Sequence, residues 1–259
     1  MHLLNIFQSE WLKRKRSLAS WLVIIGGLFT PVIIFTMRMV YHQRLSLPQK
    51  FQSADFWQIS WNQSWESMAL FMLPMGIIMA TGLMTQLEYK NNAWKQLHTT
   101  PQRMATIFCM KLLIILIMLV QVFVVFNAGL YLFGILPSLL LSSVSYPAAS
   151  FPFAMVMQWN INFFLDCLPI VGLQYVLGLH FKNFLVPFGA GFLLWVVCMS
   201  GLTWEYNYIL PYSYTMLDYL VLAGRKIRIG TDIHVMSVMY FAIFIVGGYA
   251  VYIWKNEKG

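Results

Sequence analysis

Few residues of this chain have types and spacings that could carry chemistry, and the first is an aspartate within a long apolar stretch. Asp166 shares that stretch with Asn162 and Gln174. An ionisable group at membrane depth is costly to bury, so it is a candidate for proton transfer or for lining a polar pathway. The structural alternative is that Asp166 reaches interfacial water or bonds across a helix contact. Asn127, in the preceding apolar stretch, admits the same two interpretations.

Other reactive side chains are scattered. The five histidines show no H-E-x-x-H spacing and the three cysteines form no close pair, so neither a metal site nor a disulfide is expected. The sequence has no G-x-S-x-G nucleophile turn and no G-x-x-x-x-G-K-[ST] loop for ATP phosphates. An ATP-driven protein with this sequence therefore needs a separate ATPase. An integral membrane enzyme acting on lipid, with Asp166 or a histidine as general base, is the alternative.

The composition is that of a membrane protein. Of 259 residues, 59% are hydrophobic and only 10% are charged, against about 25% charged in soluble domains. The net charge of +8 could suggest nucleic acid, but the basic residues lie in short loops beside apolar runs, where membrane orientation explains them better. Membrane lipids are therefore expected partners, and nucleic acid is not.

Six apolar stretches are long enough to cross a bilayer core of about 30 Å as helices. They predict an all-α integral membrane protein, a single domain over residues 1–259, with spans at 18–39, 67–87, 106–134, 160–181, 184–204 and 234–254. Most Lys and Arg residues fall on one side of these spans, which places both termini in the cytoplasm. The chain is thus predicted to be a multi-pass protein of the inner (cytoplasmic) membrane.

The N-terminus is predicted to be a helix that lies along the membrane surface. Residues 2–12 place Phe7 and Trp11 on an apolar face, with polar side chains including Glu10 largely on the opposite face. A basic cluster that includes Lys13 follows, as is typical of the cytoplasmic interface.

Three connections are predicted on the outer side, at 40–66, 135–159 and 205–233. The first and last are rich in Trp and Tyr, whose rings favour the headgroup zone. These aromatic residues include Trp57, Trp61, Trp65, Trp204, Tyr206, Tyr208, Tyr212 and Tyr214. Residues 212–222 are apolar enough to dip into the bilayer but too short to cross it as a helix.

A polar segment at 88–103 joins the second and third predicted spans. Trp94 and Leu97 are three residues apart and so share a face of a short helix, which Pro101 keeps from simply continuing. That face offers a partner an apolar contact, and the flanking basic residues can pair with an acidic rim. The alternative is an amphipathic loop anchored in the headgroups.

Five residues in and after this segment stand in a recognisable order: Glu88, Leu97, Pro101, Arg103 and Lys111. This order resembles the first cytoplasmic loop of the ABC type-2 exporter permeases, which carries a coupling helix that docks on an ATPase. The run 7–17 is similar to their elbow helix and first span. The run 173–184 is similar to their turn between spans four and five, as seen in the peptide-antibiotic (lantibiotic) immunity and multidrug branch.

The resemblance implies roles for particular residues. Those that would dock on the ATPase are Glu88, Trp94, Lys95, Leu97, Pro101 and Arg103. The elbow helix would occupy residues 1–17, with Phe7, Glu10, Trp11 and Lys13. The region 205–233 would form short outer helices between spans five and six.

The resemblance also implies partners. These are a dimer of ABC ATPase subunits that binds ATP and Mg, and a second permease, either a copy of this chain or a related one. No cofactor is expected on the chain itself. The implied function is ATP-driven export of a substrate such as a peptide antibiotic or a drug, or its extraction from the membrane without complete translocation.

Overall fold

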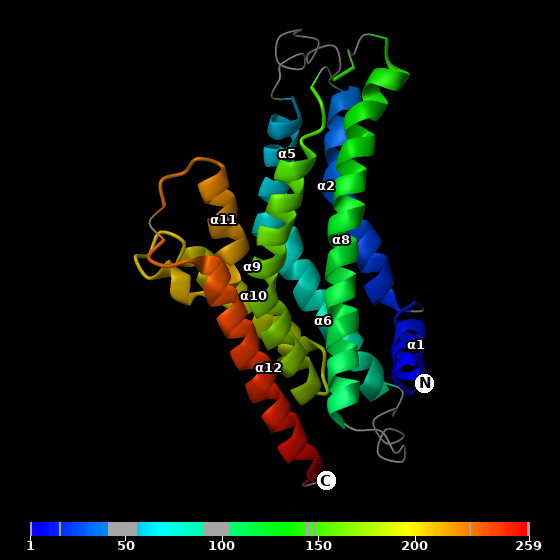
Figure 1. The fold of residues 1–259 in the computed structure, drawn as a ribbon, viewed down its shortest axis with the longest axis vertical. Helices are drawn as coiled ribbons and strands as arrows, with labels where there is room; N and C mark the ends of the chain where they lie inside the picture. The colour runs from blue at the N-terminus through cyan, green and yellow to red at the C-terminus, as the bar shows by residue number, and fades with distance from the viewer. Residues whose placement is uncertain are drawn as a thin grey trace.

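The computed structural model describes residues 2–15, 17–40, 56–90, 104–142, 146–147, 149–227 and 229–257. Over these ranges the chain is predominantly helical and contains no strand, which confirms the predicted all-α fold (Figure 1). The elements are α1 (His2–Lys15), α2 (Leu18–Val40), α5 (Phe56–Ser67), η1 (Met68–Met72), α6 (Leu73–Lys90), α8 (Met104–Leu140), α9 (Phe153–His180), α10 (Leu185–Ser200), η2 (Asn207–Ile209), η3 (Pro211–Ser213), α11 (Tyr214–Leu222) and α12 (Ile233–Glu257).

Five segments of the described chain are long and apolar enough to cross a membrane, and they correspond to five of the six predicted spans. They are Leu18–Val40, Phe56–Leu87, Met104–Leu140, Phe153–His180 and Ile233–Trp254. The remaining predicted span, 184–204, is the shorter apolar helix α10, which has 16 residues. At 1.5 Å per residue it is about 24 Å long, less than the hydrocarbon core that an upright span must cross.

The second span begins at Phe56, not at residue 67, because α5, η1 and α6 form one continuous helical segment. The prediction that Trp57, Trp61 and Trp65 lie in the headgroup zone is therefore wrong, since all three are buried within the bundle. Their spacing of four residues places them on one helical face. Trp65 stacks on Phe163 of α9, with ring centroids 4.0 Å apart. The polar residues between the tryptophans make this helical period hard to recognise in the sequence.

The second span is not regular throughout, because η1 is a single turn of π-helix directly before Pro74. The backbone N–H of Leu73 donates to the carbonyl of Met68, five residues back, so the Ala69 carbonyl loses its usual helical donor. Pro74 has no N–H, so the Leu70 carbonyl loses its donor as well. Two adjacent carbonyls in the middle of a span thus need partners from elsewhere.

Two neighbouring helices supply those partners through their side chains. Thr215 of α11 donates its hydroxyl to the Ala69 carbonyl at 2.9 Å, and Trp195 of α10 donates its indole N–H to the Leu70 carbonyl at 3.0 Å. A membrane interior offers no water to replace such donors. The π-turn therefore ties the second span to both α10 and α11.

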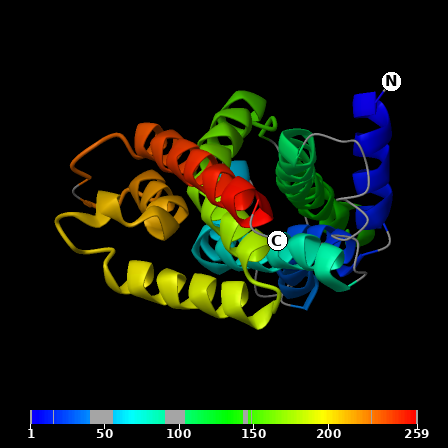
Figure 2. The same ribbon diagram turned by 90° about the horizontal axis from the view of Figure 1, so that it is seen from below.

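The bundle has two sides that α6 joins. On one side α2 packs closely along α8, and on the other α9 packs along α12, while α6 contacts both α2 and α9 (Figures 1 and 2). Glycine permits both close approaches: a Cβ on Gly27 would lie 2.9 Å from Val125 Cγ1, and one on Gly172 would lie 3.1 Å from Phe241 Cδ2. Larger residues at these positions would force the helix pairs apart.

The chain between α10 and α12 folds into η2, η3 and α11, so it contains short helices as predicted, while their place on the outer side stays a prediction. Tyr212 and Tyr214 were predicted to lie among the headgroups, but both are buried in the protein. The Tyr214 hydroxyl donates to the Tyr208 carbonyl at 2.6 Å. Tyr212 is buried in the main core, where η3 packs against α9, whereas Tyr214 is buried in a second cluster with Leu217 and Ile233. The sequence pattern reveals neither contact.

Replacing Thr215 with Val should destabilise the protein, because the Ala69 carbonyl then lacks a donor while the side-chain shape is retained. We expect a loss of about 1 kcal/mol, seen as a drop of about 2–4 °C in the apparent melting temperature of the detergent-solubilised chain. Thr215→Ser keeps the hydroxyl and is the matched control. Equal melting temperatures for the Val and Ser variants would contradict the role given to this hydrogen bond.

Candidate functional site

The predicted coupling segment lies between the end of α6 at Lys90 and the start of α8 at Met104. The start of α8 lies at the same end of the bundle as α1 and the C-terminal end of α12 (Figure 1). Glu88 belongs to the last turn of α6. The other predicted docking residues lie outside the described residues, and their role stays a prediction: Trp94, Lys95, Leu97, Pro101 and Arg103.

Helix α1 lies along one edge of the bundle and crosswise to its long axis, as Figure 2 shows from below, which is the orientation of an interfacial helix. Phe7 and Trp11 stack with ring centroids 5.8 Å apart. Glu10 forms an ion pair with Lys13 one turn later. Glu10 was predicted to lie on the polar face, but it is buried, because the helix packs against α8 and α2 rather than lying free on a membrane surface.

The residue that joins α1 to the bundle is Arg14, which the sequence presents only as one of several cytoplasmic cations. Arg14 is buried, donates from Nη2 to the Gln121 side chain of α8, and lies with its guanidinium carbon 4.4 Å from the centre of the Trp11 ring. Burial lowers the pKa of the Arg14 guanidinium. No local signal distinguishes Arg14 from Lys13 and Lys15, because its partner lies on a distant helix.

The corner between α1 and α2 is held by the carbonyl of Arg14. Ser17 Oγ and Ser20 Oγ both donate to it, at 2.7 and 2.8 Å, and the backbone N–H of Ser17 donates at 2.8 Å. These donors satisfy the Arg14 carbonyl, one of those that the C-terminal end of a helix leaves without an intrahelical partner. This arrangement sets the direction in which the first span leaves the interfacial helix.

Two of the predicted pathway residues lie fully buried on α9 and bond across helix contacts. His234 Nδ1 of α12 lies 3.0 Å from Asp166 Oδ1. Gln174 Nε2 donates to the Tyr212 hydroxyl of η3 at 2.9 Å. The Asp166–His234 pair can hold or pass a proton, whereas the Gln174 bond is neutral. The Asp166–His234 contact could not be predicted from the sequence, because the two residues are 68 positions apart and no local pattern links them.

The other two predicted pathway residues lie elsewhere. Asn127 of α8 donates to Asn160 of α9 at 2.9 Å, and both line an apolar groove of about 530 Å³ between the two helices, together with aromatic residues such as Tyr131. Asn162 is half-buried and forms none of the hydrogen bonds found among the described residues. Three of the four predicted pathway residues thus bond across three different contacts between elements, and the pathway role of all four stays a prediction.

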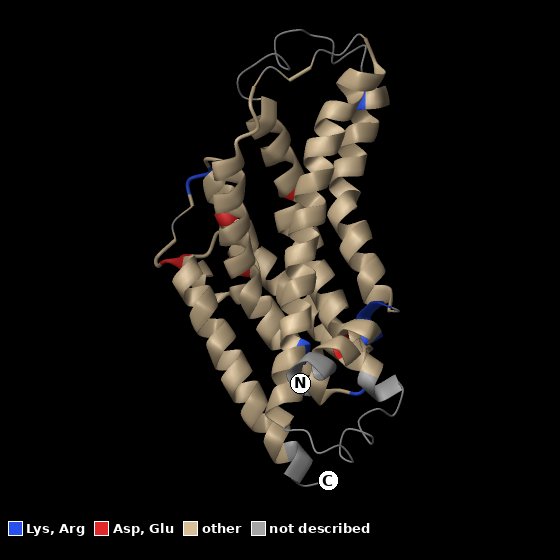
Figure 3. Ribbon diagram, turned by 45° about the vertical axis from the view of Figure 1, so that its right-hand side comes forward, with Lys and Arg blue, Asp and Glu red and all other residues tan. Residues whose placement is uncertain are grey.

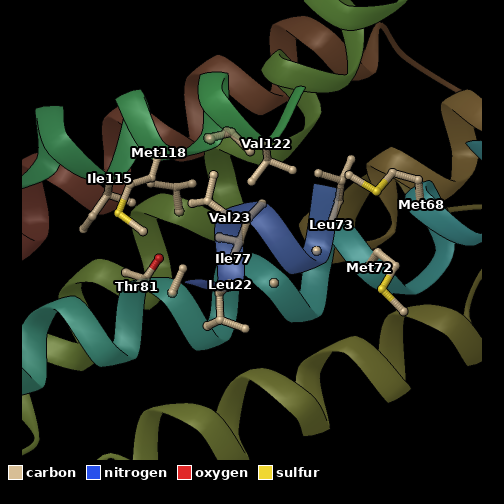
Figure 4. Close-up of a pocket in the computed structure, with 15 residues that line it drawn as sticks. Leu22, Val23, Met68, Met72, Leu73, Ile77, Thr81, Ile115, Met118 and Val122 are labelled. Carbon is tan, nitrogen blue, oxygen red and sulfur yellow. The ribbon is translucent and has the colours of Figure 1, made fainter. Parts of the chain in front are cut away.

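A second space lies inside the bundle between α2, η1, α6 and α8 (Figure 4). It is a cavity of about 40 Å³ whose lining contains one polar side chain, Thr81, among residues such as Met68, Met72 and Met118. A buried water needs two to four polar partners, and Thr81 is the one polar side chain in this lining. The cavity is therefore suited to apolar groups and not to water. Flexible methionine side chains are well suited to filling such an irregular space as the helices move.

The sequence model of the ABC-2 family transporter proteins matches residues 6–198, most of the chain. The chain belongs to this family. Neither the search of curated proteins nor that of solved structures found a match to the chain. The matched range runs from α1 almost to the end of α10 and leaves η2, η3, α11 and α12 outside it.

Family membership identifies the chain as the multi-pass membrane subunit, or permease, of an ABC transporter, which works with an ABC ATPase subunit. Within the described part of the permease, no three His, Cys, Asp or Glu side chains are grouped so that they could hold a metal ion.

Replacing Gln121 with Leu should loosen α1 from the permease, because the buried Arg14 loses its side-chain acceptor. We expect limited trypsin digestion of the detergent-solubilised permease at Lys13 to Lys15 to become several-fold faster. Gln121→Glu keeps an acceptor at the same position and should digest at or below the original rate. If the Leu and Glu variants are cut equally fast, Gln121 does not anchor α1.

Proposed function

We propose that this permease couples ATP hydrolysis by a separate ATPase to the export of a substrate, or to its extraction from the membrane, through the segment 88–103. The observation that carries the proposal is the ABC-2 family match over residues 6–198, which includes this segment and both helices that flank it. Since the sequence has no phosphate-binding loop, ATP and Mg would bind to the partner ATPase subunits.

The flanking helices suggest how the force would travel. Movement of the coupling segment would push on the end of α6, which continues through η1 into α5. A π-turn is a rare interruption of an α-helix that is frequently found at functional sites. Thr215 and Trp195 hold the two freed carbonyls of this turn. A shift at the π-turn would therefore reach α11 and α10 on the outer side.

The proposed substrate is amphipathic, in keeping with a peptide antibiotic or a drug. The groove between α8 and α9 is nearly all apolar, with the amides of Asn127 and Asn160 as its polar element. A second permease, either a copy or a related chain, would complete the transporter. In this proposal the permease lies in the inner (cytoplasmic) membrane with both termini in the cytoplasm.

An integral membrane enzyme acting on lipid is the alternative function. The Asp166–His234 pair resembles the base of a hydrolase, but such a base must contact a nucleophile or a metal. The nearby hydroxyl of Ser237 is buried and has no hydrogen-bond partner among the described residues. Lipid hydrolysis by the purified permease without nucleotide, lost in Asp166→Asn, would favour this alternative.

Replacing Leu97 with Asp should abolish docking, because it places a charge in the proposed apolar contact with the ATPase. The permease would be coexpressed with the ATPase encoded beside it, and both copurification and ATP hydrolysis would be measured. We expect at least a tenfold loss of both, with a smaller loss for Trp94→Ala.

The matched control for docking is Leu97→Met, which keeps the apolar contact and should retain assembly. Unchanged copurification and hydrolysis in Leu97→Asp would reject the docking role of this segment.

Cysteine labelling in intact cells tests the proposed orientation. A single cysteine placed after the C-terminal Gly259, or before His2, should react with a membrane-impermeant maleimide only after the cells are opened. A cysteine in place of exposed Arg225, between α11 and α12, should react in intact cells. Labelling of both termini in intact cells would reverse the orientation.

A further inference from the structure

Three titratable side chains on three packed helices lie in the region where α12 begins, and two of them are in direct contact. They are Asp166 of α9, Asp218 of α11 and His234 of α12. His234 Nδ1 lies 3.0 Å from Asp166 Oδ1, and the charge of Asp218 acts on both partners of this pair. Asp166 is 0% exposed and Asp218 is 7% exposed. Acidic segments lie along this side of the bundle in Figure 3.

Besides the buried thiol of Cys167, which follows Asp166 on α9, two other titratable groups lie around this cluster, and both already have other hydrogen bonds. Asp232 is exposed and caps α12, where Oδ1 accepts the backbone N–H groups of His234 and Val235 at 2.9 and 3.3 Å. Tyr214 of α11 donates its hydroxyl to the Tyr208 carbonyl. Neither group offers a proton or a positive charge to the buried carboxylates.

Each buried carboxyl group keeps one oxygen without a partner. Asp166 Oδ2 and Asp218 Oδ2 are both shielded from solvent and accept no hydrogen bond. One imidazolium can balance only one of two carboxylates, so the cluster would bury a net negative charge unless it held a further proton. An uncompensated buried charge costs several kcal/mol, and such groups normally neutralise by binding a proton.

The chemistry of the cluster indicates that its ligand is a proton. Because both unpaired oxygens are shielded from solvent, they are closed to an organic cation in this conformation, whereas a proton needs no added space. The described residues also contain no group of three metal-binding side chains. Burial raises the pKa of the Asp218 carboxyl, the direction expected for a group that retains its proton.

We propose that Asp166, Asp218 and His234 form a proton-binding site that closes α11 and α12 against α9. The closed cluster is neutral when it holds two protons, shared among one imidazole and two carboxyl groups. If α11 and α12 move away, water reaches the two buried carboxyl groups as well as the part-exposed His234, and the protons leave at neutral pH. Opening of this side of the permease is therefore accompanied by proton release, and it becomes easier as the pH rises. This inference does not depend on the ATPase docking proposed above.

Cys167 provides the measurement, since it follows Asp166 on α9 and is fully buried. In the full-length permease with Cys109→Ala and Cys198→Ser, the rate of labelling by N-ethylmaleimide would be measured between pH 7 and 8. Dividing this labelling rate by the rate for the denatured chain at the same pH removes the effect of thiol ionisation on the rate. This ratio, the opening constant, should rise about tenfold per pH unit for each proton released.

The pH slopes of substitution variants show how many protons the cluster releases when it opens. The opening constant should rise by well over tenfold per pH unit with all three side chains present, by about tenfold in Asp218→Asn, and not at all in the Asp166→Asn, Asp218→Asn double variant. Asp232→Asn removes a nearby carboxylate that is exposed, so it should keep the original pH slope. It is the matched control.

Two results would overturn the proposal. One is an opening constant that is independent of pH while the cluster is intact, or a slope that survives in the double variant. The other is an opening constant that follows sodium concentration at fixed pH, which would make the site a metal-cation site.

Discussion

The structure depends most on the two backbone carbonyls that the π-turn and Pro74 release in the second span. Within a membrane these groups must find donors in the protein, and they find them in Thr215 and Trp195. The requirement brings α10 and α11 against the second span, although the chain that connects these elements is long. A backbone defect in one span thereby sets the position of the outer helices.

Elsewhere in the bundle, polar side chains also find their hydrogen-bond partners on other elements. Arg14 bonds to Gln121, Asn127 to Asn160, and Gln174 to Tyr212, each across a contact between elements. Inside a membrane such bonds contribute modestly to stability but strongly to which faces meet. The Asp166–His234 pair differs, because both of its members are titratable and because Asp166 and nearby Asp218 each keep one carboxyl oxygen unpaired. Polar groups that merely position helices are thus separated from a cluster that can respond to protons.

The coupling segment and the proton site would act on different helices of the bundle. Force from the ATPase would enter where α6 ends and α8 begins, whereas the buried acidic cluster closes the region where α11 and α12 meet α9. The π-turn of the second span lies between these regions in the connectivity of the fold, because it continues into α6 and bonds to α11. ATP-driven motion and proton release would therefore be linked through α11.

The sequence by itself determined the all-α membrane fold, the approximate spans and the family, because these depend on apolar length, on charge in the loops and on local residue order. It placed the Phe7–Trp11 face correctly, since that contact is local. It misplaced Trp57, Trp61, Trp65, Tyr212 and Tyr214, because an aromatic side chain suits both the headgroup zone and a packed interior. Only the tertiary structure decided between these two, and only it paired Asp166 with His234 and Arg14 with Gln121, since partners far apart in the chain leave no local pattern.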